Sequence, residues 1–161
     1  MKTKTLVKDA VLVAISLGIS LIEARIPLPI PIPGVKPGLG NIAGIYAMFT
    51  MSIKDCFMVM FLRIFLFGLL NGNMVSFLLS FAGGLFCFLQ LCLMKKILNK
   101  EQIWVAGISG AVFHNLGQIL MAVILYKDTA LFYFLPFLMV SGIVTGLLSG
   151  FLAKECVKRL S

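Results

Sequence analysis

Long apolar runs alternate with short polar breaks along the whole chain. The breaks consist of lysines, of asparagine with glycine, or of a proline-rich stretch, and most runs approach the roughly 20 residues that an α-helix needs to cross a membrane. The pattern predicts six transmembrane helices, which cover about residues 5–25, 38–52, 54–70, 74–95, 102–126 and 130–154. The second and third are short for a span, which indicates tilt, partial burial or a deep loop.

The segment between the first two predicted helices, RIPLPIPIPGVKPGLGN (25–41), contains five of the six prolines of the chain. Proline removes backbone donors and disfavours helical backbone in the residue before it, so this segment cannot itself be a spanning helix. A proline-rich segment also loses little conformational entropy when it becomes ordered. We therefore interpret the segment as a lid over a binding pocket, and the alternative is a short extracellular linker that is kept extended.

The composition is that of an integral membrane protein, with 60% hydrophobic and 12% charged residues. Six helices with short loops use nearly all of the 161 residues, so we expect one transmembrane domain, 1–161, surrounded by membrane lipid. The N-terminus begins like a signal peptide, but LIEARIP follows the apolar run where a cleavage site of small residues would stand. We therefore expect this first apolar run to remain as a helix.

The positive charges indicate an orientation in the membrane. Fourteen lysines and arginines give a formal net charge of +8. With a cytoplasmic N-terminus, ten of them fall inside and three outside, as the positive-inside rule requires, and the C-terminus is also inside. The ten inside residues are Lys2, Lys4, Lys8, Lys54, Lys95, Lys96, Lys100, Lys154, Lys158 and Arg159. Arg25, Lys36 and Lys127 lie outside, and because the topology accounts for the charge we expect no nucleic-acid partner.

Arg63 lies near the middle of the third predicted helix. A charged side chain at that depth costs about 2.5–3.5 kcal/mol or more unless it is paired or faces water. Glu23, near the outer end of the first predicted helix, is the acidic residue that could reach it. Two interpretations stay open at this point: a purely structural ion pair between Arg63 and Glu23, or a pair that lines a ligand cavity.

Three more polar side chains lie about midway along the fifth predicted helix: His114, Asn115 and Gln118. His114 and Gln118 are four residues apart and share a face, with Asn115 on its flank. These side chains form either the wall of a cavity or hydrogen bonds between helices. Together with Asn41 at the start of the second helix, they place the unexplained polar groups in the outer half and at the midplane, which predicts a pocket open to the exterior.

Small residues recur at four-residue spacing on the first helix, at Ala10, Ala14 and Gly18. Such a face permits close approach of another helix, either within the chain or from a partner. The last helix repeats the spacing at Gly142, Gly146 and Gly150.

The sequence lacks the motifs of several functional classes. It contains no phosphate-cradling glycine-rich loop followed by lysine, and no cluster of aspartates that would hold Mg²⁺ for diphosphate chemistry. The four cysteines show no CxxC spacing, so no metal, haem or iron–sulfur site is expected. We therefore expect no catalytic residues, no cofactor and no enzymatic activity in this chain alone.

Several stretches resemble one known family. They are PGVKPGLGNI (33–42), FLRIFLFGLL (61–70), SFAGGL (80–85), AVFHNLGQ (111–118) and SGIVTGLLSGFLA (141–153). In this order, over nearly the whole chain, they resemble the Gx transporter family, which also carries the name heptaprenyl diphosphate synthase component I. That family is similar to the substrate-binding S components of energy-coupling factor (ECF) transporters, which are six-helix membrane proteins with both termini inside and an outward pocket capped by the first loop.

The resemblance implies an S component in the cytoplasmic membrane of a bacterium that captures a small nutrient or cofactor precursor. Its partners would be a T subunit, docked on the AxxxA pattern at Ala10 and Ala14, and two cytoplasmic ATPases. In the pocket, Arg63 and His114 are expected to bind an anionic or carbonyl-bearing ligand. The other expected site residues are Asn115, Gln118 and Asn41 for orientation, Lys36 at the entrance and Glu23 beside Arg63.

Two other functions remain open. One is a non-catalytic membrane subunit linked to isoprenoid or quinone synthesis, as the synthase name suggests. The other is a membrane component of a redox assembly, which the missing cofactor ligands disfavour. The proteins that co-purify with the chain would distinguish the three.

Overall fold

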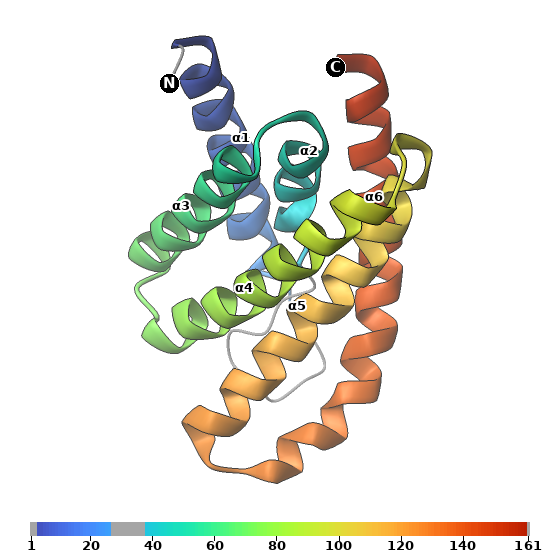
Figure 1. The fold of residues 1–161 in the computed structure, drawn as a ribbon. Coiled ribbons are helices and arrows are strands. Elements are labelled where there is room, and N and C mark those ends of the chain that lie inside the picture. The colour runs from blue at the N-terminus through green and yellow to red at the C-terminus, as the bar shows by residue number, and fades with distance from the viewer. Residues whose placement is uncertain (1–2, 27–37, 161) are drawn as a thin grey trace.

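Helices account for nearly all of the described part of the chain. The computed structural model describes residues 3–26 and 38–160, and no strand occurs within these ranges. The helices are α1 (Thr3–Glu23), η1 (Leu39–Asn41), α2 (Ile42–Thr50), α3 (Ile53–Asn71), α4 (Met74–Ile97), η2 (Lys100–Gln102), α5 (Ile103–Tyr126), η3 (Thr129–Phe134) and α6 (Leu135–Leu160) (Figure 1). The all-helical class and the six α-helices expected from the sequence are confirmed within these ranges.

Local sequence signals set the limits of α3. The helix begins with a capping box, in which the Ser52 side chain accepts from the backbone N–H of Asp55 and the Asp55 side chain accepts from Ser52. These two bonds satisfy backbone donors that have no partner within the helix. The helix ends at Gly72, whose φ of 62° lies in the left-handed region that glycine adopts without steric cost. Asn73 then caps the start of α4 by accepting from the backbone of Ser76 at 3.0 Å.

Four segments within the described ranges are long and apolar enough to cross a membrane: Thr3–Glu23, Met74–Ile97, Lys100–Tyr126 and Thr129–Leu160. The second predicted span is different, because η1 and α2 together cover only Leu39–Thr50. At 1.5 Å per residue this segment is about 18 Å long, too short for a hydrocarbon core of about 30 Å. Residues 43–48 of α2 are buried inside the bundle, so partial burial, one of the readings allowed by the sequence, is the one observed.

The third predicted span also departs from a simple membrane helix. α3 has 19 residues, but Lys54, Asp55 and Arg63 lie within it. With these three charged residues, α3 is less apolar than the four segments named above. Length and composition therefore support four of the six membrane spans that were expected from the sequence.

Glycines bring α5 and α6 into close contact. A Cβ atom added at Gly107 of α5 would meet the Gly146 carbonyl oxygen and the Gly150 backbone, and one added at Gly150 would lie 2.8 Å from the Trp104 backbone. Only glycine permits this approach, because any side chain would force the helices apart. The glycine spacing of the last helix is thus used for packing within the chain.

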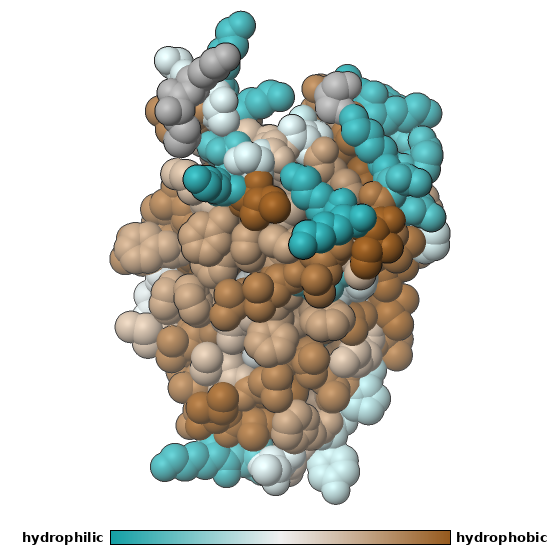
Figure 2. Space-filling view, viewed as in Figure 1, coloured by the Kyte–Doolittle hydropathy of each residue, from teal (hydrophilic) through white to brown (hydrophobic). Residues whose placement is uncertain are grey.

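The ends of the bundle separate the polar from the apolar surface. Both chain termini lie at the upper end in Figure 1, with the α2–α3 and α4–α5 connections, while the α5–α6 connection lies at the opposite end. On the face shown in Figure 2, hydrophilic side chains gather at the upper end and a smaller group lies at the lower end, with a broad hydrophobic band between them. This arrangement is that of a membrane protein with both termini on one side.

Candidate functional site

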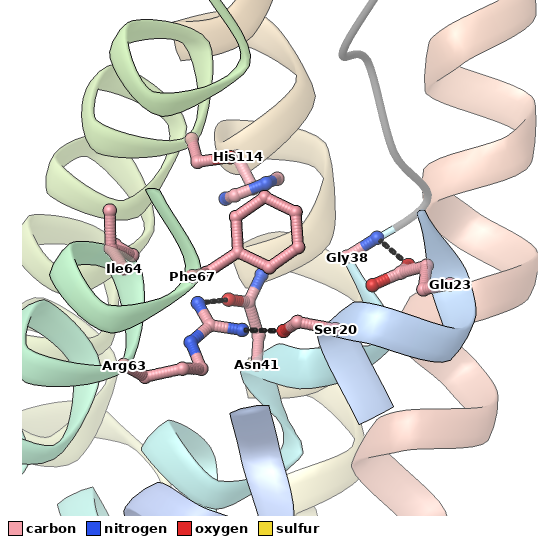
Figure 3. A pocket seen from close by; sticks show the side chains of 9 residues that line it. Ser20, Glu23, Gly38, Asn41, Arg63, Ile64, Phe67 and His114 are labelled. Atoms are coloured by element: carbon pink, nitrogen blue, oxygen red, sulfur yellow. Dashed lines mark hydrogen bonds between the residues drawn. The ribbon is translucent and has the colours of Figure 1, made fainter. Parts of the chain in front are cut away.

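A small polar cavity lies where α1, η1, α3, α4 and α5 meet. Its volume is about 20 Å³, which is room for about one water molecule or a small polar group. The described residues that line it are Ser20, Glu23, Gly38, Asn41, Arg63, Ile64, Phe67, Ser80 and His114 (Figure 3). Most of these are polar, which is unusual for a cavity inside a bundle whose surface is largely apolar.

Arg63 enters the cavity from α3 and is 6% exposed. Its guanidinium donates from Nη1 to Ser20 Oγ at 3.2 Å and from Nη2 to Asn41 Oδ1 at 2.9 Å (Figure 3). Both acceptors are neutral oxygens. The hydrogen bonds therefore hold the guanidinium in place without neutralising its charge.

Glu23, at the end of α1, is engaged by the backbone on the other side of the cavity. Its carboxylate accepts hydrogen bonds from the N–H groups of Gly38, of Leu39 at 2.8 Å and of Gly40 at 3.5 Å. The carboxylate thereby satisfies free donors at the start of η1 and ties this segment to α1. Between the described residues Arg63 and Glu23 no ion pair forms, so the direct pair expected from the sequence is replaced by separate partners for each side chain.

Two glycines permit this close arrangement. Gly38 has a φ of 92°, in the left-handed region that side chains disfavour. At Gly40, a Cβ atom would collide with Arg63 Nη1 and Ser20 Oγ. The GLGN part of the proline-rich segment therefore allows the backbone to pass directly beside the guanidinium.

His114 lines the cavity from α5, whereas its two polar neighbours do not. Asn115 is fully buried and donates from Nδ2 to the Leu138 carbonyl oxygen of α6 at 2.6 Å. This is the interhelical hydrogen bond that the sequence offered as the alternative to a cavity wall. Gln118 is also fully buried, and its side chain lies with His114 against Gly83 of α4, where a Cβ atom would approach both.

The predicted site residues thus fall into three groups. Glu23, Asn41, Arg63 and His114 lie together around the cavity. Asn115 and Gln118 lie in the bundle interior, outside the cavity lining, because their positions on α5 turn them towards α6 and α4. Lys36 and most of the predicted lid, 27–37, lie outside the described residues.

Sequence reasoning did not identify Ser20 and Ser80 as site residues. A signal for Ser20 exists, because the buried residues of α1 recur every three or four positions and most of them are polar. They are Asp9, Val13, Ser16, Ser20 and Glu23. This polar stripe faces the bundle interior. Ser80 lies four residues after Ser76 on the same buried face of α4, and this spacing is the signal that could have marked it.

The small-residue face of α1 is not used for packing within the described chain. Ala10 and Ala14 are exposed, and a Cβ atom at Gly18 would meet no heavy atom within 4 Å. The face is therefore open to lipid or to another protein.

Comparison with known proteins gives one family. A family model described as heptaprenyl diphosphate synthase component I matches residues 12–156, a range that includes every cavity residue. No curated protein and no solved structure matches the chain. In the described part of the chain, no group of three or more His, Cys, Asp or Glu residues is placed to hold a metal ion.

Proposed function

The chain belongs to the heptaprenyl diphosphate synthase component I family, and from this premise we propose that it is a non-catalytic membrane subunit that captures a small molecule in the Arg63 cavity for import. The family name itself points to a component of a synthase. The import role rests on the cavity and on what the sequence resemblance implies, namely a likeness of this family to the S components of ECF transporters.

One observation carries the proposal: a buried guanidinium lies at a cavity and is held only by neutral oxygens in the described structure. Burial of an ionisable group among membrane helices is costly, and such groups most often mark the path or site of a ligand. A purely structural arginine would be expected to pair with a carboxylate. Glu23 is near enough to line the same cavity but bonds to backbone N–H groups instead.

The exposed small-residue face supports the assembly that this function needs. The sequence contains no nucleotide-binding loop, so the energy for import would come from other chains. A T subunit docked on Ala10, Ala14 and Gly18 would link the chain to two ATPases. The open space at these residues would admit a closely packed helix. The expected location is the cytoplasmic membrane of a bacterium.

A second candidate function follows from the family description. The chain would then be the membrane partner of a soluble prenyl diphosphate synthase, without catalytic residues of its own. This candidate predicts a different partner, an enzyme that carries the aspartate-rich motifs that are missing here.

Purification from native membranes in mild detergent tests the proposal. We expect a T subunit and ATPases to co-purify with the wild-type chain and to be lost with Ala14→Leu, because the larger side chain would hold the partner helix away. Val144→Leu, at an exposed position of α6, is the matched control and should retain both partners.

Recovery of a prenyl diphosphate synthase in place of the ATPases would contradict import and support the second candidate. Equal recovery of the T subunit with Ala14→Leu would show that docking uses another surface.

A further inference from the structure

We infer that the cavity takes the carboxylate of a small monoanionic molecule, held by Arg63, Asn41 and Ser80. The inference deepens the proposed function, since it names the class of substrate for the same cavity.

The first step concerns the charge of Arg63. A guanidinium has five N–H donors, and the described structure uses one of them for Ser20 and one for Asn41. A buried charge is stabilised most by a counter-charge with matching geometry, and a carboxylate can receive two parallel N–H bonds from arginine. The Glu23 carboxylate acts on Arg63 through its charge from across the cavity, but the hydrogen bonds that its oxygens accept come from backbone N–H groups. The two parallel N–H bonds of an arginine–carboxylate pair are therefore not made within the described structure.

The second step concerns Asn41 and Ser80, which are 3% and 6% exposed and both line the cavity. Asn41 Oδ1 accepts from Arg63, so its Nδ2 must act as a donor elsewhere. Among the described residues, neither Asn41 Nδ2 nor Ser80 Oγ has a hydrogen-bond partner. Leaving such groups unsatisfied is costly, and one bound acceptor would satisfy both of them.

The third step concerns size and charge. The cavity volume of about 20 Å³ suits one small polar group. Arg63 is the one lysine or arginine among the described lining residues, and the Glu23 carboxylate lies in the same lining. A diphosphate with several negative charges would therefore remain largely uncompensated, and one negative charge is the most that the cavity suits. Ile64 and Phe67 form the apolar part of the lining, against which the hydrocarbon part of an acid can begin to pack.

Simple probe compounds test the inference on the purified full-length chain in detergent. Benzoate and acetate are compared with benzamide, benzylamine and inorganic pyrophosphate, by the shift of the thermal unfolding midpoint and by saturation-transfer NMR. We expect the two carboxylates to bind and to raise the midpoint, and the amide, the amine and pyrophosphate to do neither.

A response to pyrophosphate alone, an equal response to benzamide, or no response to either carboxylate would each overturn the inference. None of these outcomes changes the co-purification of a T subunit and ATPases. The proposed substrate class and the proposed import function are therefore tested by separate measurements, and either can be wrong while the other holds.

Two buried serines provide a matched pair of variants. Ser80→Ala removes the hydroxyl without a partner and should weaken benzoate binding by about 10- to 150-fold, the effect of one hydrogen bond to a charged acceptor. The midpoint without benzoate should stay the same or rise. Ser149→Ala removes an equally buried hydroxyl, 2% exposed, that donates to Gly146 of its own helix at 3.2 Å. It should leave benzoate binding unchanged.

Asn41→Asp gives the sharpest test, because it places a carboxylate oxygen where Asn41 Oδ1 lies, 2.9 Å from Arg63 Nη2. The chain then supplies the counter-charge itself. We expect the midpoint without benzoate to rise and the response to benzoate to be lost. A variant that still binds benzoate as the wild type does would show that the anion is not held by Arg63.

Discussion

At the scale of single residues, Asp9 is another buried polar group without a hydrogen-bond partner among the described residues. It lies on the inward stripe of α1, is 5% exposed, and neither carboxylate oxygen has a hydrogen-bond partner within the described structure. Asp9→Asn removes the buried charge at constant size. It should therefore raise the free energy of unfolding by about 1–3 kcal/mol, measured by denaturant titration in detergent.

Asp55 is the control for this substitution. Its carboxylate accepts from the Ser52 backbone at 3.2 Å and from the Ser52 hydroxyl at 2.8 Å, and it lies at the N-terminal end of α3, where a negative charge is favourable. Asp55→Asn should leave stability unchanged or lower it. A loss of stability with Asp9→Asn as well would show that Asp9 is paired with a group beyond the described residues.

At the scale of elements, the contact between α5 and α6 depends on glycine. A Cβ atom at Gly146 would lie 2.6 Å from the Gly107 carbonyl oxygen and 2.7 Å from the Ile108 Cα. Backbone cannot yield as a flexible side chain can, so Gly146→Ala should lower the free energy of unfolding by about 1–3 kcal/mol. Gly18→Ala on α1, where the added carbon meets open space, should be neutral or gain up to about 1 kcal/mol. Equal effects of the two would mean that the helices can separate without cost.

At the scale of the whole molecule, the charge distribution predicts the orientation of the bundle in the cell membrane. In a background with the four native cysteines replaced by alanine, Lys127→Cys should react with an impermeant thiol reagent in intact cells. Lys96→Cys should react only after permeabilisation, because the charge distribution predicts a cytoplasmic position for it. Labelling of Lys96→Cys in intact cells would show that the true orientation is the reverse of the predicted one, with the cavity on the inner side.

Much of the fold could be predicted from the sequence because its signals are local. Apolar runs and breakers place the helices, and the lysines that separate them indicate the orientation, since each acts through its own depth in the membrane. The short length of the second predicted helix was also visible. The reason for this short length could not be predicted, because tilt, a deep loop and burial inside a bundle all give the same run of apolar residues.

The site is only partly determined in this way. The sequence alone marks Arg63, Glu23, Asn41 and His114 as polar groups in an expensive place, and the cavity lining includes all four. The partners of Arg63 depend on tertiary structure, because Ser20 lies 43 residues away along the chain. The different positions of Asn115 and His114 also depend on tertiary structure. Adjacent residues of a helix point about 100° apart, and only the packing of α6 and α4 decides which of the two lines a cavity. Hydrophobicity acts on each residue separately, whereas a binding site depends on which side chains meet, and that is decided when the helices pack.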